Sequence, residues 1–454
     1  MQRREFLSTL AAAPALAQSN SAARAKKPNF VFILADDLGY GDLSCYGQSM
    51  FETPNLDRLA KDGTRFEAAY AGATVCAPSR CALMTGQHTG HCRVRGNGKN
   101  EEVLRKSDLV IPELLKANGY KTGMFGKWGL GDLGHAGYPN DKGWDEWFGY
   151  FSQFHAHQYY PHMLLHNRET VELRGNWGTG KKEFAPDVIH ARAMAWLEKQ
   201  SATEPFFLYY TSTIPHTNNE LGRDTGNGQE VPEDAPFSGK PWPQVEKNFA
   251  AMIHRLDRQV GQLVDTLKQR GLYENTMILF TSDNGAHKEG GHDANFFKSA
   301  GAVRGTKRDL TDGGIRVPAF AIWANQIPAG KVNPQPWAFW DVMPTYCEAA
   351  GINAPKHIDG VSMLPDWTGK GTVNHPHFYW EFHEGGFAQA IRKDHWKLIK
   401  QKNGQFELYD LAKDIREENN LAAANPKLVE ELRAVMRKSR VDSQDWPVAA
   451  NLKA

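Results

Sequence analysis

Short apolar runs rich in β-branched and aromatic residues recur along most of the chain, and stretches with helical spacing lie between them. Runs of this kind predict strands that are buried on both faces of a sheet. We expect strands at Asn29–Leu34, Lys121–Phe125, Phe206–Thr211, Met277–Thr281 and Val317–Trp323. Strands that alternate with helices predict an α/β domain with a mainly parallel sheet flanked by helices.

Apolar residues spaced three or four apart predict the helices between these strands. We expect them after Thr53-Pro54 and at Ile111–Asn118, Pro186–Lys199, Gln244–Arg270 and Trp340–Ala350. The longest shows the clearest pattern, because apolar residues from Met252 to Leu267 keep this spacing until Gly271 ends it.

The pattern changes near residue 370, where short strands follow one another closely. They are predicted at Phe378–Phe382, Phe387–Ile391, Trp396–Ile399 and Phe406–Tyr409, and a charged helix is predicted near Pro426–Arg440. Close-spaced strands joined by turn residues predict an antiparallel sheet. We therefore expect a main domain in residues 28–370 and a small antiparallel α+β subdomain in residues 371–454.

The first 25 residues have the pattern of an export signal. Arg3-Arg4 precedes an alanine-rich apolar run from Leu10 to Leu16, and small residues follow. A twin-arginine or general secretory signal predicts a periplasmic or secreted protein; the alternative is a short amphipathic helix. No later apolar run reaches ~18 residues, so we expect no transmembrane segment in the mature chain.

The composition is that of a globular protein, with 454 residues, 41% of them apolar and 23% charged. The net charge is +1, from 53 basic and 52 acidic residues, so nothing indicates a nucleic-acid partner and any anion site must be local. The five cysteines show no zinc-site spacing, which argues against a thiolate metal centre and leaves disulfide pairing open.

Acidic residues follow two of the predicted strands directly. Asp36 and Asp37 end the first strand, and Asp283 and Asn284 follow the strand Met277–Thr281. Ligands of α/β sheets bind at the carboxyl ends of strands, although such residues are also common in turns. Three carboxylates and an amide offer only oxygen ligands, so these residues predict a site for Ca²⁺ or Mg²⁺ if the strands are neighbours.

Basic residues and a histidine lie near other strand ends. Arg80, Lys127 and Lys307 would add positive charge, and His216 follows the strand Phe206–Thr211. A divalent cation surrounded by fixed cations can bind a tetrahedral oxyanion ester. These residues alone do not distinguish a sulfate ester from a phosphate ester.

The run Cys76-Ala77-Pro78-Ser79-Arg80, followed by Leu83-x-Thr85-Gly86, resembles the signature of the formylglycine-dependent sulfatases. Further motifs resemble that family in the same order: Lys127, Asp283-Asn284-Gly285, Lys307 with its Gly-Gly-Ile-Arg-Val-Pro run, and Asp359-Gly360-x-Ser362. The resemblance covers roughly residues 28 to 440. It implies the alkaline-phosphatase-like α/β sandwich with a C-terminal subdomain.

The resemblance also implies a mechanism, in which a maturase oxidises Cys76 to formylglycine. A hydrated aldehyde has two hydroxyls on one carbon, so one hydroxyl can attack sulfur. The other hydroxyl can then lose its proton, and collapse to the aldehyde expels sulfate. The implied calcium ligands are Asp36, Asp37, Asp283, Asn284 and the modified Cys76, with Mg²⁺ as an alternative. Arg80 would steady the hydrate, Lys127 and Lys307 would bind sulfate oxygens, and His216 would protonate the leaving oxygen.

The chain departs from the family at Gly129, where many members have a histidine two residues after the lysine. A subfamily could lack this histidine, its loss could weaken activity, or another histidine could fill the space. We favour the third interpretation, with His155 or His157 as the candidates. The alternative for their surroundings is an aromatic packing loop.

Aromatic residues and histidines are concentrated in Tyr150–Pro161, and polar residues occur at His383–Gly386 and Arg392-Lys393. Aromatic rings stack on sugars and polar groups bind hydroxyls, so we expect a sulfated carbohydrate substrate that contacts His155, His157 and the lysines. Two alternatives are a phosphate or phosphonate ester hydrolase of the same superfamily and a non-catalytic glycan-binding relative. Only Gly129 favours the latter.

Overall fold

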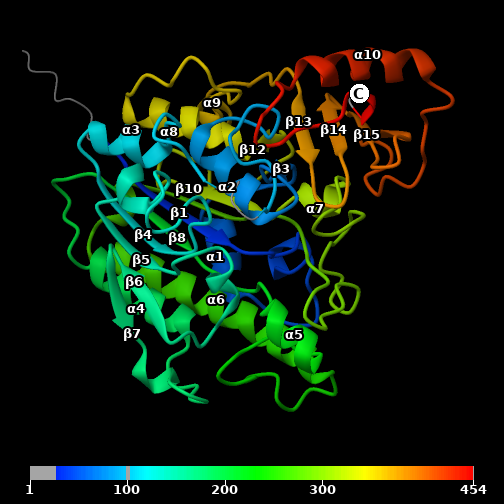
Figure 1. The fold of residues 1–454 in the computed structure, drawn as a ribbon. Coiled ribbons are helices and arrows are strands. Elements are labelled where there is room, and N and C mark those ends of the chain that lie inside the picture. Colours follow the sequence, from blue (N-terminus) through cyan, green and yellow to red (C-terminus); the bar gives the residue numbers. More distant parts are fainter. Residues whose placement is uncertain (1–26, 99–102, 453–454) are drawn as a thin grey trace, which may run out of the picture.

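The computed structural model describes residues 27–98 and 103–452, so the predicted export signal lies outside the described residues. Within them, ten strands form the main sheet: β1 (Asn29–Ala35), β2 (Thr64–Phe66), β4 (Lys121–Gly126), β5 (Glu146–Gly149), β6 (Met163–His166), β7 (Glu169–Glu172), β8 (Phe206–Thr211), β9 (Thr276–Ser282), β10 (Ala319–Ile322) and β11 (Lys331–Asn333). Their order is β11-β2-β10-β9-β1-β8-β4-β5-β6-β7 (Figure 1).

The central strands β9, β1, β8, β4 and β5 run parallel to one another, which confirms the predicted mainly parallel sheet. On one side β10 pairs antiparallel with β9, and on the other β6 and β7 form an antiparallel extension. In the register of β1 and β9, Ala35 lies opposite Ser282. These two strands therefore end side by side, and the residues after them emerge together.

Helices cover both faces of the sheet (Figure 1). One layer contains α1 (Pro54–Asp62), α4 (Ala185–Leu197) and α6 (Gln244–Gln269), and the other contains α2 (Cys76–Thr85), α3 (Ile111–Ala117), α8 (Val342–Ala350) and α9 (Leu364–Trp367). Strand β1 shows why both layers form, since Val31 and Ile33 pack into the first core while Phe30 and Phe32 pack into the second. Two further short helices are α5 (Asn219–Thr225) and α7 (Asp312–Ile315).

The C-terminal subdomain is an antiparallel sheet of β13 (Phe378–Phe382), β14 (Ala388–Lys393), β15 (Trp396–Lys400) and β16 (Phe406–Asp410), with α10 (Pro426–Lys438) after it. One face, with Trp380, packs against Tyr70 and Trp340 of the main domain, where a two-stranded sheet pairs β3 (Ala69–Tyr70) with β12 (Trp337–Ala338). The other face packs against α10. The small subdomain is therefore joined to the main domain by an apolar interface, and its antiparallel sheet confirms the prediction.

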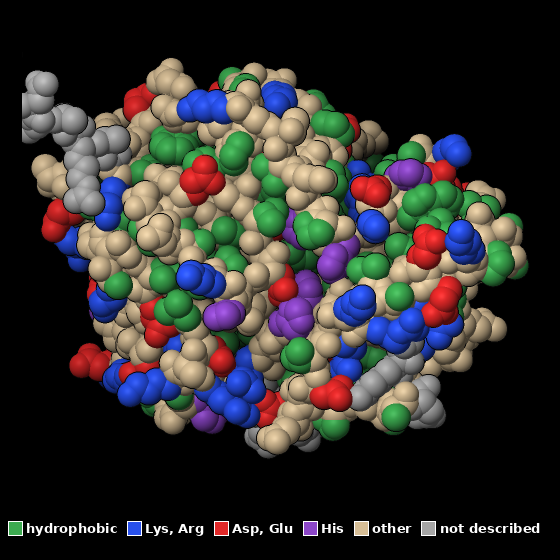
Figure 2. All heavy atoms as spheres, turned by 90° about the horizontal axis from the view of Figure 1, so that it is seen from above, with side chains coloured by type: hydrophobic (Ala, Val, Ile, Leu, Met, Phe, Trp, Pro, Cys, Tyr) green, Lys and Arg blue, Asp and Glu red, His purple; other side chains and the backbone are tan. Residues whose placement is uncertain are grey.

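Charged side chains of both signs are interspersed over the face that Figure 2 shows, in keeping with the near-zero net charge. No helix in the described ranges is both long and apolar enough to cross a membrane. None of the five cysteines, all of which are described, forms a disulfide.

Candidate active site

The predicted metal ligands meet at the carboxyl ends of β1 and β9. Asp36 and Asp37 follow β1, Asp283 and Asn284 follow β9, and all four are fully buried. The backbone N–H of Asp37 donates to Asp283 Oδ1 at 3.1 Å, and Asn284 Nδ2 donates to Asp37 Oδ1 at 2.7 Å. Because the two strands are parallel neighbours that end together, the expected convergence of these four side chains occurs.

Unsatisfied oxygens show that this cluster fits a cation. Asp36 Oδ1 and Asn284 Oδ1 are buried and have no hydrogen-bond partner within the described chain. Burial and the neighbouring Asp36 carboxylate raise the pKa of Asp283 to about 7. Ligand atoms of Asp36, Cys76 and Asp283 lie within 4.8 Å of one another. A hard divalent cation would bind these oxygens and favour the ionised form of Asp283.

Two buried lysines stand beside the acids. Lys127 Nζ donates to Asp36 Oδ2 at 2.7 Å, and Lys307 Nζ donates to Asp37 Oδ2 at 2.8 Å. Burial disfavours the charged form of Asp36, but Lys127 and the other nearby cationic groups outweigh it and hold its pKa well below the usual range. Each ammonium carries three donors, so each lysine can bind its aspartate and still donate to an anion.

Arg80 is the third cation and lies on α2, one turn beyond Cys76. Its side chain has no exposed surface, and its Nε and Nη2 donate to Asp283 Oδ2 at 3.0 and 2.8 Å. Its Nη1 donates to the backbone carbonyl of Lys127 at 2.7 Å. This guanidinium therefore connects α2 to both the acid cluster and the end of β4.

Cys76 is the first residue of α2 and is 3% exposed. Burial raises the pKa of its thiol to about 11, so the thiol is protonated at neutral pH. No side chain of the preceding residue caps this helix; instead Asn97 Oδ1 accepts a hydrogen bond from the Ala77 N–H at 3.2 Å. An unmodified cysteine here is a weak nucleophile, because the reactive form is the thiolate.

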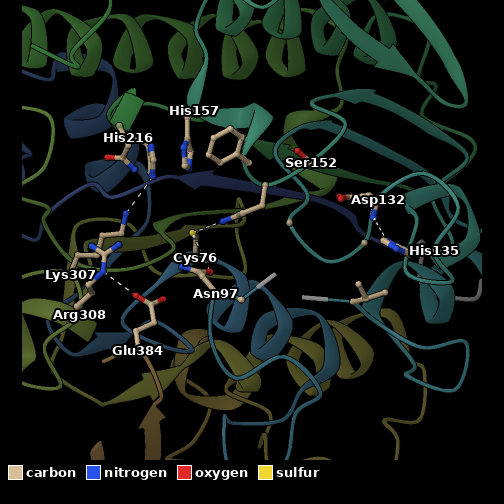
Figure 3. Close-up of a pocket in the computed structure, with 17 residues that line it drawn as sticks. Cys76, Asn97, Asp132, His135, Ser152, His157, His216, Lys307, Arg308 and Glu384 are labelled. Carbon is tan, nitrogen blue, oxygen red and sulfur yellow. Dashed lines mark hydrogen bonds and ion pairs between the residues drawn. The ribbon is translucent and has the colours of Figure 1, made fainter. Parts of the chain in front are cut away.

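His216 lies across the cavity from Cys76 (Figure 3). Its Nδ1 donates to the backbone carbonyl of Thr217 at 2.7 Å, while its Nε2 lies 3.4 Å from Lys307 Nζ. Burial and the Lys307 charge lower the pKa of His216 well below its usual value. Because the Thr217 carbonyl fixes the proton on Nδ1, the Nε2 atom that faces Lys307 is the unprotonated ring nitrogen.

The two histidines of the aromatic loop have different surroundings. His157 lines the cavity, stacks on His216 with ring centroids 5.0 Å apart, and lies 3.2 Å from Glu220. His155 is not among the described residues that line the cavity; its Nδ1 accepts from the Phe151 N–H at 3.3 Å. The structure thus places His157 at the site and gives His155 a role in holding the loop.

The cavity has a volume of about 610 Å³ and is open to solvent. Cys76 lies near its middle, with Lys307, His216 and His157 on one side and Ser152, Asp132 and His135 on the other (Figure 3). Arg308 and Glu384 also line it, and Glu384 comes from the loop between β13 and β14. The C-terminal subdomain therefore contributes to the wall of the site.

Comparison with known proteins decides the family. A family model described as Sulfatase matches residues 28–352, and one described as N-sulphoglucosamine sulphohydrolase, C-terminal, matches residues 305–443. The chain belongs to the sulfatase family. It is a sulfuric ester hydrolase, and the resemblance in its motifs is thereby confirmed.

This sulfatase is similar to several named relatives. Arylsulfatase A of Homo sapiens is 30% identical, covering 94% of this chain and 91% of the relative. N-acetylgalactosamine-6-sulfatase of Sus scrofa is 32% identical, covering 78% of this chain and 68% of the relative. The solved structure of Ps i-CgsB in complex with k-i-k-neocarrahexaose is 29% identical, with a TM-score of 0.80, and covers 94% of this chain and 96% of that one.

Within the candidate site of this sulfatase, Gln153 and Asn97 contact Cys76, although neither is predicted from the sequence. Gln153 Nε2 donates to Cys76 Sγ at 2.6 Å, and Asn97 Oδ1 lies 3.8 Å from the same sulfur. A Cβ added at Gly129 would lie 2.3 Å from Gln153 Oε1. The preferred expectation that a histidine occupies the space beside Gly129 is therefore wrong, because the glutamine lies there.

Glu289 and Arg308 are further unpredicted residues of the sulfatase site. Glu289 Oε2 accepts from Lys307 Nζ at 3.1 Å, and its other oxygen pairs with Arg308. Arg308 also donates to Glu384 Oε2 at 3.0 Å. Their only sequence signal is nearness to predicted residues, since Arg308 follows Lys307 directly.

Proposed function

We propose that this sulfatase removes sulfate from a sulfated carbohydrate, through a formylglycine made from Cys76 and a divalent cation. Ca²⁺ is the first candidate and Mg²⁺ the second, and Asp36, Asp37, Asp283 and Asn284 would hold it together with residue 76. The observation that carries the proposal is the cluster that Cys76 forms with three buried acids and three buried cations, beside a cavity that Cys76 and Lys307 line.

The need for a modified residue follows from the environment of the thiol. With a pKa of about 11, the Cys76 thiol is neutral at physiological pH and is a weak nucleophile. A formylglycine hydrate, when present beside a divalent cation, supplies a hydroxyl nucleophile that the cation makes more acidic. Arg80 lies one turn along the same helix and would steady the anion that develops there.

Lys127 and Lys307 are suited to hold the sulfate group. Each is buried and fixed by one aspartate, so its position is set before a substrate binds. Once a cation shares the charge of Asp36 and Asp37, the remaining ammonium donors are available to sulfate oxygens. The lysines would thereby bind the ester and withdraw charge from sulfur.

His216 is the candidate proton donor to the leaving oxygen. Its Nδ1 is committed to the Thr217 carbonyl, so Nε2 is the atom that can carry the proton. Burial and Lys307 keep the free imidazole neutral, and an anionic ester bound beside it would favour its charged form. A proton held at Nε2 would then assist departure of a sugar hydroxyl.

A carbohydrate substrate fits the cavity and the relatives. Phe154 lines the cavity and is 60% exposed, and polar groups of Asn219, Arg308 and Glu384 surround the same space. An exposed ring with several hydrogen-bonding groups suits a sugar better than a lipid. One relative is named N-acetylgalactosamine-6-sulfatase, and one similar solved structure contains k-i-k-neocarrahexaose.

We place the activity in the periplasm or outside the cell, because residues 1–25 have the composition of an export signal. The proposal also requires a maturase that oxidises Cys76. Amino-terminal sequencing of the protein from its native source would test the first point, because retention of residues 1–25 in the exported protein contradicts a cleaved signal.

Peptide mass spectrometry across residue 76, with protein from the native source, tests the mechanism. Conversion of cysteine to formylglycine lowers the peptide mass by about 18 Da. Release of inorganic sulfate from sulfated mono- and oligosaccharides tests the substrate class, with phosphate mono- and diesters in parallel. An unmodified peptide in active protein would refute the mechanism, and faster phosphodiester hydrolysis would refute the substrate class.

A further inference from the structure

The amide of Gln153 lies against the nucleophile position, at the place left open by Gly129. We propose that Gln153 is a catalytic residue that hydrogen-bonds the reacting oxygen of residue 76 and orients it for attack. It thereby takes the place of the histidine that many sulfatases have at position 129. This inference rests on the proposed function, because the reacting oxygen exists only after Cys76 is modified.

The side chain of Gln153 occupies the space that a side chain at position 129 would enter. A Cβ at position 129 would lie 2.3 Å from Gln153 Oε1, which is far inside van der Waals contact. Gly129 also has a φ of +76°, a conformation that most side chains avoid. A side chain at position 129 would therefore displace the Gln153 amide and strain the backbone, so glycine at this position leaves the space beside Cys76 to Gln153.

Neither nearby histidine can serve instead. His155 is held by the Phe151 N–H and is not among the described cavity-lining residues. His157 stacks on His216 and hydrogen-bonds with Glu220 at 3.2 Å, on the leaving-group side of the cavity. Gln153 is the side chain whose nitrogen lies 2.6 Å from Cys76 Sγ.

The amide is chemically matched to a hydrated aldehyde. Its Nε2 can donate to one hydroxyl oxygen, and its Oε1 is buried and has no hydrogen-bond partner among the described residues. A carbon–oxygen bond is shorter than a carbon–sulfur bond, so a hydroxyl in place of the thiol lies farther from Nε2, nearer an ordinary hydrogen-bond length. A group with a donor and an acceptor can bind both hydroxyls of a hydrate.

The loop that carries Gln153 is held by local hydrogen bonds. Ser152 Oγ accepts from the His155 N–H at 3.0 Å, and the Ser152 carbonyl accepts from the Ala156 N–H at 3.3 Å. The short 3₁₀ turn His155–His157 follows directly. These contacts fix the backbone beside Gln153, so the amide is oriented before a substrate binds.

Two variants separate the hydrogen bond from packing. Gln153→Met keeps the length of the side chain but removes its donor and acceptor, while Gln153→Glu keeps the shape but removes the donor. Gln158→Ala is the matched control, since Gln158 lies in the same loop and is exposed. Each protein is assayed for kcat and KM on a small aryl sulfate and for the converted fraction of residue 76 by peptide mass.

We expect kcat per converted enzyme to fall about 10- to 100-fold in both Gln153 variants, the effect of one hydrogen bond to a reacting group. KM is expected to change less than about threefold, since the bond strengthens toward the transition state. Gln158→Ala should match the wild type. An unchanged kcat per converted enzyme in Gln153→Met overturns the inference, whereas a wild-type protein that releases no sulfate overturns the proposed function instead.

A swap of the pair gives a second readout. Gly129→His alone should lose activity, because its side chain displaces the Gln153 amide and its backbone is strained at a φ of +76°; Gly129→His combined with Gln153→Ala should recover only the part that comes from the displaced amide. An amide does not titrate in the working pH range but a histidine does, so the double variant should gain a titrating group in the pH profile of kcat. An active double variant with the wild-type pH profile contradicts the assignment of Gln153.

Discussion

The contact between the C-terminal subdomain and the main domain includes a buried ion network that a single substitution can test. Lys397, on β15, has no exposed side-chain surface. Its Nζ donates to Asp312 Oδ1 at 2.6 Å and lies 2.9 Å from Glu417 Oε1. Asp312 opens α7 in the main domain, five residues beyond Lys307, so the network ties the subdomain to the segment that carries a lysine proposed to bind sulfate.

Replacing Lys397 by methionine keeps the length of the side chain and removes its charge. Breaking one partner of a buried ion network costs about 3–5 kcal/mol of unfolding free energy, because the remaining charge is left uncompensated. Asp312 keeps a hydrogen bond from the Tyr70 hydroxyl at 2.9 Å and an ion pair with Arg316 at 3.3 Å. The unpaired charge in the variant is therefore mainly that of Glu417.

The cost depends on pH. Burial already raises the pKa of Glu417 from 4.5 to about 7, against the opposing effect of Lys397. When a carboxyl has a higher pKa in the folded than in the unfolded state, the free energy of unfolding falls as the pH rises from the unfolded to the folded pKa. Removal of Lys397 extends this window to higher pH, so Lys397→Met should cost less near about pH 5.5 than near about pH 8.

Urea unfolding of the wild type and Lys397→Met at these two pH values measures the effect. Lys397→Met combined with Glu417→Gln should recover much of the loss at the higher pH, because no buried carboxylate then lacks its partner. The exposed Lys413, with 85% of its side chain accessible, supplies the control Lys413→Met. An equal loss at both pH values, or no loss at either, would refute the argument from the unpaired carboxylate.

Three further predictions concern the cavity. His216→Asn should lower kcat about 10²–10⁴-fold on sugar sulfates but less on activated aryl sulfates, because good leaving groups need no proton; comparing rates on both substrates tests this. Chelation of divalent cations should abolish activity and lower Tm, and added Ca²⁺ should restore both, because a cation offsets the repulsion among the buried acids; a Tm that ignores chelation contradicts it. Phe154→Ala should raise KM for an oligosaccharide but not for a small aryl sulfate, since the exposed ring would contact only neighbouring sugars; equal effects on both KM values contradict this.

The central strands and long helices could be predicted because their apolar patterns are long and regular. Strands β8 and β13 have the predicted bounds, and the long helix α6 ends one residue before its predicted end. Strands β2 and β11, which lie next to each other at one side of the sheet, have only three residues each, too few to show a period of two. Strand β10 is antiparallel although its residues resemble those of a buried parallel strand, and only the tertiary structure determines that direction.

In the site too, some contacts follow from local sequence patterns and others depend on the tertiary structure. The acids could be predicted to meet because strand ends of a parallel sheet share one edge, and the opposition of Ala35 and Ser282 brings them together. Gln153 and Asn97 could not be predicted, since each reaches Cys76 from a loop whose path depends on distant contacts. Gly129 showed in the sequence that the family's histidine is absent, but a missing side chain does not identify the residue that replaces it.

The charges around the nucleophile explain how the site can fold and still attract an anion. Asp36, Asp37 and Asp283 supply three negative charges when ionised, and Arg80, Lys127 and Lys307 supply three positive ones, so the buried cluster is balanced. Burial and the nearby Asp36 carboxylate raise the pKa of Asp283, and a divalent cation would displace its proton. With the cation bound, the cluster would carry about two excess positive charges. Because it is buried away from water, these charges would attract an anion more strongly than surface charges do. A sulfate ester carries one negative charge, so this cluster would not repel it. The negative charge that develops during the reaction would be surrounded by fixed cations.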